Sequence, residues 1–208
     1  MTYTVTVEQE AQRLHRVRVQ VLDDAGNVVR EDLMNQRVAV LDLGFGTSDL
    51  LVLREQMQID SQASRNIPGG MSSLVDRLKR ALHADPRFRM LQPDQLQPHE
   101  LEPILRTGQI PGWNRDLDGL RDVVEAIKRD AVETFIQRLQ TALGRRPANT
   151  IVLTGGGAAL LGEYLVPRLQ EAFSLSDVLI PDAPSLANAR GFCRMARQYA
   201  AARGITVA

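Results

Sequence analysis

The sequence predicts an α/β fold, with a mixed β-sheet flanked by helices and a small, mostly helical insert. Three observations predict this fold: apolar, branched runs come first, a long helical stretch follows, and two strand–helix units end the chain. The early runs are joined by short turns, whereas the late ones alternate with helices. We therefore expect an initial strand meander followed by crossover units.

The first part of the chain has the patterns of β-strands. Residues 3–7, YTVTV, alternate in polarity, and VRVQVL at 17–22 predicts a hairpin that turns at Gly26 and Asn27. Residues 38–43, VAVLDL, are almost continuously apolar, which is typical of a strand buried on both faces. Residues 50–64 supply one further long strand or two.

Helical spacing begins after the glycine pair at 69 and 70. A stripe of Leu74, Leu78 and Leu82 predicts a helix, and residues 98–108 predict a short one. Residues 85–95 and 108–114 are rich in turn formers and predict loops. We expect Trp113, in the second of these loops, to fill a seam between helices.

The longest predicted helix lies within residues 116–144. Its apolar residues recur at helical spacing, Asp116 offers an N-terminal cap, and Gly144 followed by Pro147 offers a stop. A strand, TIVLT, and another helix follow, and we expect Pro167 to kink or restart that helix.

The chain closes with a strand, DVLI at 177–180, and a last helix that we expect Ser185 to cap. Cys193 lies in this helix beside Phe192 and Met195. That apolar company predicts a buried, inert thiol.

Composition excludes several classes of function. In 208 residues, Lys and Arg number 25 and so do Asp and Glu, so no global field steers the chain towards nucleic acid or an anionic membrane. One cysteine allows no intramolecular disulfide, which fits a reducing compartment. No apolar run is long enough to span a bilayer, and the N-terminus lacks signal-peptide features. We expect a cytoplasmic protein with neither nucleic acid nor membrane as a direct partner.

The stretch DLGFGTSD, residues 42–49, interrupts an otherwise apolar run. Pairing across a hairpin would bring Asp42 and Asp49 to about 5 Å between Cα atoms, where two carboxylates repel unless a cation or donors lie between them. Gly44 and Gly46 would let backbone N–H groups approach an anion. A plain hairpin turn and a phosphate loop with a magnesium site both explain this stretch.

Two further glycine breaks lead from a strand into a helix. Gly155, Gly156 and Gly157 would place bare backbone at the positive end of a helix, and three glycines in succession favour a ligand over a tight turn. Gly69 and Gly70 are more simply explained as an ordinary turn.

Four stretches in order, DLGFGTSD, GGM, TGGGAALL and PSLANARGF, together resemble the actin-like ATPase superfamily, which includes DnaK-type chaperones and sugar kinases. LDDAGNVV and the late ANARGF are similar to the ParM/StbA-type actin-like proteins of plasmid segregation and their archaeal relatives. The resemblance covers residues from about 18 to 200 and is weakest between 84 and 116.

The resemblance implies an RNase H-like lobe and a role for each loop. DLGFGTSD corresponds to the family's second phosphate loop, which makes Asp42 the expected catalytic residue and, with Asp49, a ligand of Mg²⁺. The residues expected to face the β- and γ-phosphates of ATP or GTP are Gly44, Phe45, Gly46 and Thr47. Those expected near the ribose and α-phosphate are Gly69, Gly70, Gly155, Gly156 and Gly157.

Family members have two similar lobes that hold ATP in the cleft between them. The first lobe carries a D-x-G-x-G/N loop near its N-terminus, and this sequence has no copy of it. It therefore resembles the C-terminal lobe. We expect residues 1–35 to form a preceding β segment, 36–70 and 145–208 the nucleotide-binding subdomain, and 71–144 the helical insert.

The resemblance implies the C-terminal lobe of a filament-forming ATPase of the plasmid-segregation or cytoskeletal type. Its expected partners are copies of the complete protein in a filament, the N-terminal lobe and a DNA-binding adaptor. Phosphoryl transfer needs positioning groups from both lobes, so we expect little hydrolysis from this chain alone. The alternative is a non-enzymatic module that caps or regulates filaments of a complete relative. A sugar-kinase or chaperone-type lobe is a weaker third reading, because residues 84–116 are short and irregular.

Overall fold

A computed structural model of the chain describes residues 4–9, 17–22, 30, 32–113, 117–144, 148–175 and 177–203. Its strands are β1 (Thr4–Gln9), β2 (Val17–Leu22), β3 (Val38–Leu43), β4 (Thr47–Arg54), β5 (Gln58–Ile59), β6 (Arg65–Pro68), β7 (Thr150–Thr154) and β8 (Asp177–Leu179). Its α-helices are α1 (Met71–Ala84), α2 (Pro98–Thr107), α3 (Leu120–Leu143), α4 (Gly156–Phe173) and α5 (Ala187–Ala202). Short 3-10 turns are η1 (Asp32–Asn35), η2 (Glu55–Met57), η3 (Pro86–Leu91), η4 (Pro93–Gln95) and η5 (Pro184–Leu186).

The main sheet is mixed, as the sequence predicts. Its order is β5-β4-β3-β7-β8, and β6 also pairs with β4. β3 and β4 form an antiparallel hairpin, whereas β7 runs parallel to β3 and β8 runs parallel to β7. β1 and β2 form a separate antiparallel pair. The meander followed by crossover units is therefore confirmed. The predicted turn at Gly26 and Asn27 lies outside the described residues.

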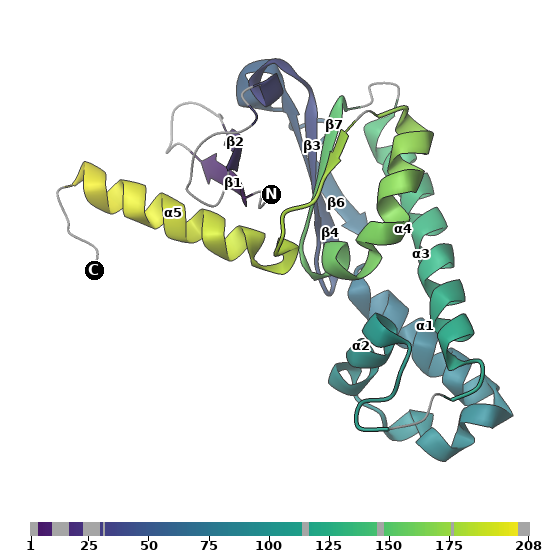
Figure 1. The fold of residues 1–208 in the computed structure, drawn as a ribbon. Helices are drawn as coiled ribbons and strands as arrows, with labels where there is room; N and C mark the ends of the chain where they lie inside the picture. Colours follow the sequence, from purple (N-terminus) through teal and green to yellow (C-terminus); the bar gives the residue numbers. More distant parts are fainter. Residues whose placement is uncertain are drawn as a thin grey trace.

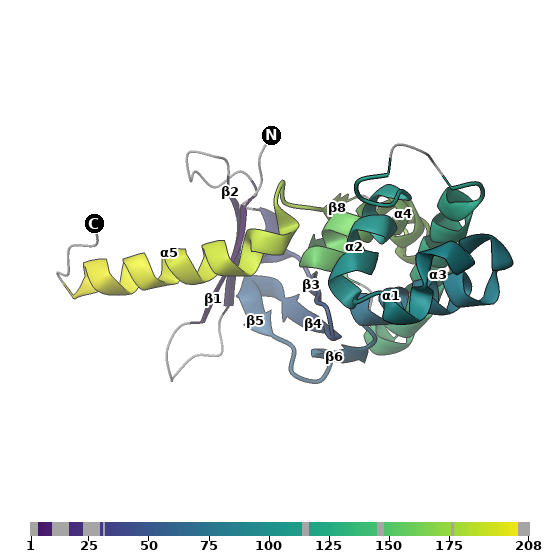
Figure 2. The same cartoon turned by 90° about the horizontal axis from the view of Figure 1, so that it is seen from below.

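Helices cover the two sides of the sheet unequally (Figures 1 and 2). α3 and α4 pack on one face, and α1 and α2 group with the lower half of α3 beyond the end of the sheet. α5 leaves the opposite side, packs along β1 and extends away from the sheet. None of the helices in the described part of the chain is both long and apolar enough to cross a membrane.

β3 is buried on both faces, as its apolar sequence predicts. Leu41 and Leu43 belong to a large cluster with α1, α3 and α4, and Val38 and Val40 belong to a smaller cluster on the opposite face with Leu33 of η1. Because neighbouring residues of a strand point to opposite faces, Asp42 shares the face of Val38 and Val40. That face is the one from which α5 departs.

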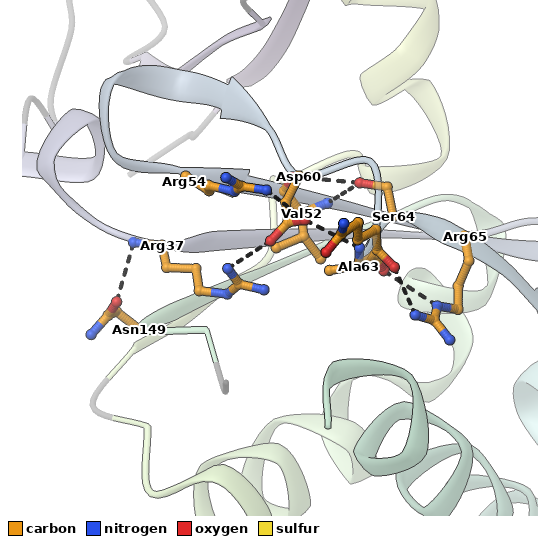
Figure 3. Close-up of polar contacts among 9 residues, drawn as sticks. Arg37, Val52, Arg54, Asp60, Ala63, Ser64, Arg65 and Asn149 are labelled. Carbon is orange, nitrogen blue, oxygen red and sulfur yellow. Dashed lines mark hydrogen bonds and ion pairs between the residues drawn. The ribbon is translucent and has the colours of Figure 1, made fainter. Parts of the chain in front are cut away.

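A buried carboxylate fixes the β4–β6 edge (Figure 3). Asp60 is only 5% exposed and accepts hydrogen bonds from Arg37 Nη1 (2.9 Å) and Arg54 Nη2 (3.2 Å). Ser64 completes the turn, because its Oγ accepts a bond from Val52 N–H (2.9 Å). Asp60 therefore joins the start of β3 to the turn that leads into β6.

Two expectations about loop and helix structure, loops at residues 85–95 and a helix restart at Pro167, are wrong. Residues 85–95 form η3 and η4, because Pro86 and Pro93 each stand at a first helical position, where their fixed φ suits a short turn. Of the kink or restart expected at Pro167, the restart is wrong, because α4 continues through Pro167 to Phe173; the kink stays a prediction. The carbonyl that Pro167 leaves without a partner is that of Glu163, an exposed residue, so water can satisfy it.

Three expectations about single residues are also wrong. Ser185 lies inside η5 and does not cap α5. Cys193 is exposed, because α5 extends away from the sheet and is not covered on all sides. Trp113 is 45% exposed in the loop after α2. The expected cap of the long helix, Asp116, lies outside the described residues, and α3 begins after Gly119.

Candidate functional site

Asp42 and Asp49 lie directly opposite each other on β3 and β4. The same row continues across the sheet, because Asp49 faces Asn66 of β6 and Asp42 faces Thr154 of β7. Residues opposite each other in paired strands share one face of a sheet. Asn66, Asp49, Asp42 and Thr154 therefore form a polar row at the end of β3 that precedes the hairpin turn.

Each carboxylate of this row bonds to a side-chain amide. Asn66 Nδ2 donates to Asp49 Oδ1 (3.0 Å), and Asn188 Nδ2 on α5 donates to Asp42 Oδ2 (2.7 Å). Among the described residues, neither carboxylate takes part in an ion pair with Lys, Arg or His, whereas several other carboxylates of the chain do. Two adjacent carboxylates without a basic partner are a donor set that suits Mg²⁺, with water or phosphate completing the shell.

The hairpin turn between β3 and β4 rests on the first turn of α1. Gly44 N–H donates to the Thr47 carbonyl (3.0 Å), while Met71 N–H and Ser72 N–H donate to the carbonyls of Gly44 (3.0 Å) and Phe45 (2.8 Å). The N-terminal amides of α1 are thus occupied by the turn itself. They hold the loop in place and are not available to a phosphate.

Gly70 permits this contact. A β-carbon at position 70 would lie 2.5 Å from the Phe45 carbonyl oxygen, far inside van der Waals contact. Gly69 adopts φ +96°, which side chains other than glycine rarely tolerate. This glycine pair therefore has a structural reason, as the sequence suggested. It allows the backbone between β6 and α1 to pack closely against the hairpin turn.

The glycine run after β7, residues 155–157, packs against Asp42 and Leu43 at the end of β3. Gly155 adopts φ +86° and donates its N–H to the Pro184 carbonyl (2.8 Å). A β-carbon on Gly157 would lie 2.6 Å from Leu43 Cβ. Two of the three glycines are thus required by close packing, and the three glycine breaks meet around the end of β3.

Gly46 and Gly156 are different, because neither packing nor backbone conformation requires glycine there. A β-carbon at either position would meet no atom of the described residues within 4 Å, and neither glycine has a positive φ. Within the described residues, the N–H groups of Phe45 and Gly46 donate to no backbone carbonyl. The first N–H groups of α4 have no intrahelical partner either. Bare backbone facing open space suits the approach of an anion.

A cavity of about 200 Å³ adjoins both loops on the helix-covered side of the sheet. Leu43, Leu74, Phe135 and Leu161 give it an apolar wall, and Gly44, Gly69, Gly70 and Gly157 close its end nearest the loops. Its polar rim comes from two helices, with Arg77 on α1 and Thr134 and Arg138 on α3. Arg138 bonds to the Pro68 carbonyl and covers Gly69.

The structure therefore brings the sequence-predicted site residues to one end of the sheet. Phe45 is 55% exposed at the tip of the turn, and Thr47 and Asp49 are exposed beside it. Their roles towards a ligand stay predictions. Sequence analysis missed Asn66, Asn188 and Arg138. Only ANARGF offered a signal for any of these, and it did not reveal that its asparagine reaches Asp42.

The family model described as "Archaeal actin homologue MreB-like, C-terminal" matches residues 40–167. The chain belongs to this family. The match to the MreB-like C-terminal domain begins in β3 and ends in α4, so it includes the hairpin turn, the helical insert and the glycine run. No curated protein matches the chain.

Solved structures of actin-like proteins share the fold of this MreB-like chain. A non-polymerisable pCBH ParM mutant is 17% identical with a TM-score of 0.63, covering 88% of this chain and 57% of that one. A ParM filament from Clostridium botulinum is 20% identical with a TM-score of 0.62, and the match covers 79% of this chain and 46% of the ParM chain. Ta0583, an archaeal actin homologue in complex with ADP, is 18% identical with a TM-score of 0.62, covering 89% and 65%. This chain thus spans only part of the length of each.

Proposed function

We propose that this chain is the nucleotide-binding C-terminal lobe of an actin-like, filament-forming ATPase, with ATP or GTP and Mg²⁺ as its ligands. The observation that carries the proposal is the pair Gly46 and Gly156. Both are glycines without a packing reason, and both present backbone to open space beside the Asp42–Asp49 pair. Glycine at such positions is explained when a ligand approaches the backbone.

The residues present fit a magnesium–nucleotide complex. Asp42 and Asp49 would hold the cation and its waters, which would neutralise part of the phosphate charge. The amides of Phe45 and Gly46 and the Thr47 hydroxyl would bind the β- and γ-phosphates. Gly156 and Gly157 would bind closer to the α-phosphate, at the positive end of α4. Gly155 would support this loop without donating to the ligand, because its N–H is already bonded to Pro184.

The cavity between α1, α3 and α4 suits the base and ribose. Its volume of about 200 Å³ lies below the range of pockets that enclose a whole drug-sized ligand, so it would hold part of the nucleotide. The apolar wall would pack on the base, and Thr134 and Arg138 would bond to polar edges. Gly69 and Gly70, at the mouth of the cavity, would lie near the ribose.

Relatives support the wider role. Ta0583 was solved with ADP, and the ParM of Clostridium botulinum forms a filament. For the complete protein we infer nucleotide-dependent, head-to-tail self-association of the plasmid-segregation or cytoskeletal type, in the cytoplasm and with a DNA-binding adaptor as a further partner. Hydrolysis would need the groups of a second lobe.

A non-enzymatic interaction module that caps or regulates filaments is a second candidate. It is favoured by the large apolar side chains exposed on the last helix, because Phe192 is 65% and Tyr199 56% exposed. Such side chains are typical of a surface that another protein covers. This role would need neither Asp42 nor the open glycines.

Calorimetric titration with Mg-ATP and Mg-GTP separates the two candidates. We expect the wild-type chain to bind and Asp42→Ala to lose binding. The control Glu55→Ala removes one negative charge at the far end of β4, and we expect it to bind as the wild type does. Circular dichroism should show that all three chains are folded. A folded wild-type chain that binds neither nucleotide contradicts the nucleotide-binding function and favours the interaction module.

A further inference from the structure

Asn188 reaches the carboxylate pair from the first turn of α5, far along the chain from the hairpin. Its Nδ2 donates to Asp42 Oδ2 at 2.7 Å. The segment before it is fixed, because the Pro184 carbonyl accepts the Gly155 N–H, and Pro184 and Ala187 are both buried. The backbone at the start of α5 is therefore held close to Gly155 and Asp42.

Asn66 makes the matching contact from the other edge of the row. It lies opposite Asp49 in the β4–β6 pairing, and its Nδ2 donates to Asp49 Oδ1 at 3.0 Å. Each carboxylate is thus bonded by one amide from outside the hairpin. Within the described residues, the second oxygen of each carboxylate, Oδ1 of Asp42 and Oδ2 of Asp49, accepts no side-chain hydrogen bond.

The chemical nature of these partners distinguishes the pair from the structural carboxylates of the chain. Asp60 and Asp32 bond to arginine, and so do Asp85 and Glu133. An arginine neutralises a carboxylate as it orients it. An amide orients a carboxylate and leaves its full negative charge available to a cation.

We propose that Asn188 and Asn66 are positioning residues for a divalent cation held by Asp42 and Asp49. The inference rests on the proposed function, which supplies the cation with its nucleotide. Each amide binds one carboxylate oxygen and so restricts the side chain to a single orientation. The carboxylates would then bind the cation through their remaining oxygens without having to reorganise. One of these oxygens, Asp42 Oδ1, lies beside Gly155 at the start of α4.

The test compares ATP binding in excess Mg²⁺ with ATP binding in EDTA, by calorimetry on the full chain. In Asn188→Ala and in Asn66→Ala, we expect the gain in affinity that Mg²⁺ provides to fall by about tenfold. Affinity in EDTA should not change, because in this proposal the two amides act on the carboxylates and make no bond to the nucleotide. The control Asn35→Ala removes an exposed asparagine from η1, and we expect it to leave both affinities unchanged.

A second variant at position 188 separates the effect on the cation from the loss of packing that Asn188→Ala could cause. Asn188→Asp places a third carboxylate beside Asp42, so we expect its melting temperature to rise with added Mg²⁺ more steeply than that of the wild type. Equal weakening of ATP binding in Mg²⁺ and in EDTA would overturn the inference, since a merely structural role predicts it. Identical responses of Asn188→Asp and Asn188→Ala to Mg²⁺ would do the same. A wild-type chain that binds ATP in neither condition refutes the proposed function itself, and the inference falls with it.

Discussion

A β-carbon at position 155 would lie 2.4 Å from Asp42 Oδ1, so glycine is the residue that fits between this carboxylate and the start of α4. The contact ties the glycine run to the acidic hairpin without any ligand. Part of the glycine pattern in this chain therefore serves packing. The glycines that we assign to ligand binding are Gly46 and Gly156, for which packing gives no reason.

We expect Gly155→Ala and Gly156→Ala to have opposite effects. Gly155→Ala combines a strained φ with clashes against the Asp42 carboxylate and the Leu43 carbonyl group. It should lower the free energy of unfolding by about 2–3 kcal/mol. Gly156→Ala has open space and a helical position, so its free energy of unfolding should stay equal or rise by about 0.5 kcal/mol. Urea denaturation of both variants measures the difference.

The same pair separates stability from binding. We expect Gly156→Ala to lose Mg-ATP affinity although it is as stable as the wild type, because its methyl group would occupy the space of the ligand. Unchanged affinity in Gly156→Ala would remove the principal support for a ligand at this loop.

Asp60 predicts a loss of stability in acid. Hydrogen bonds from Arg54 and Arg37 outweigh the cost of burial and lower the pKa of Asp60 to about 2. Its contribution is complete above the unfolded pKa of about 3.9 and is lost as pH falls through the folded value. We expect Asp60→Asn to cost about 2 kcal/mol of unfolding free energy at neutral pH and to flatten this acid dependence. Melting temperatures measured between pH 5 and pH 2, at steps of about one pH unit, test this acid dependence.

Asp76→Asn, at an exposed position on α1, is the control for Asp60→Asn and should keep the wild-type dependence of melting temperature on pH.

Tyr164 predicts a loss of stability in alkali. Its hydroxyl donates to Glu125 across the α3–α4 interface, and that bond, with burial, raises the pKa of Tyr164 to about 12. Its contribution is complete below the unfolded pKa of about 10 and is lost as pH rises through the folded value. We expect Tyr164→Phe to lower the unfolding free energy by about 1 kcal/mol at neutral pH and to reduce the alkaline loss. The control Tyr199→Phe, at an exposed position on α5, should change neither the unfolding free energy at neutral pH nor the loss of stability in alkali. An alkaline profile of Tyr164→Phe equal to the wild type would contradict the Tyr164–Glu125 bond.

Cys193 tests the placement of α5. Because its thiol is exposed on a helix that extends from the sheet, we expect one thiol per chain to react with a maleimide reagent under native conditions. Cys193→Ser should abolish labelling. Labelling that appears only after denaturation would mean that α5 is covered in solution.

The sequence was sufficient where local pattern decides the structure. The spacing of Asp42 and Asp49 around Gly44 and Gly46 predicts that the two aspartates face each other, and they do. The long helix up to Gly144 followed from its apolar period. The contacts of Asn66 and Asn188 could not be predicted, because they depend on β6 folding back along β4 and on η5 docking against Gly155. Cys193 shows the same limit, since apolar neighbours in sequence do not reveal whether another layer covers a helix.

Mg-ATP should bind where the hairpin turn meets the start of α4. A nitrogen–proton correlation spectrum of the labelled chain, recorded with and without Mg-ATP, tests it most directly. We predict that the backbone signals of Phe45, Gly46, Gly156 and Gly157 shift, while those around Asp60, at the far end of β4, do not. Shifts confined to other regions, or none in a folded chain at saturating Mg-ATP, would contradict the account.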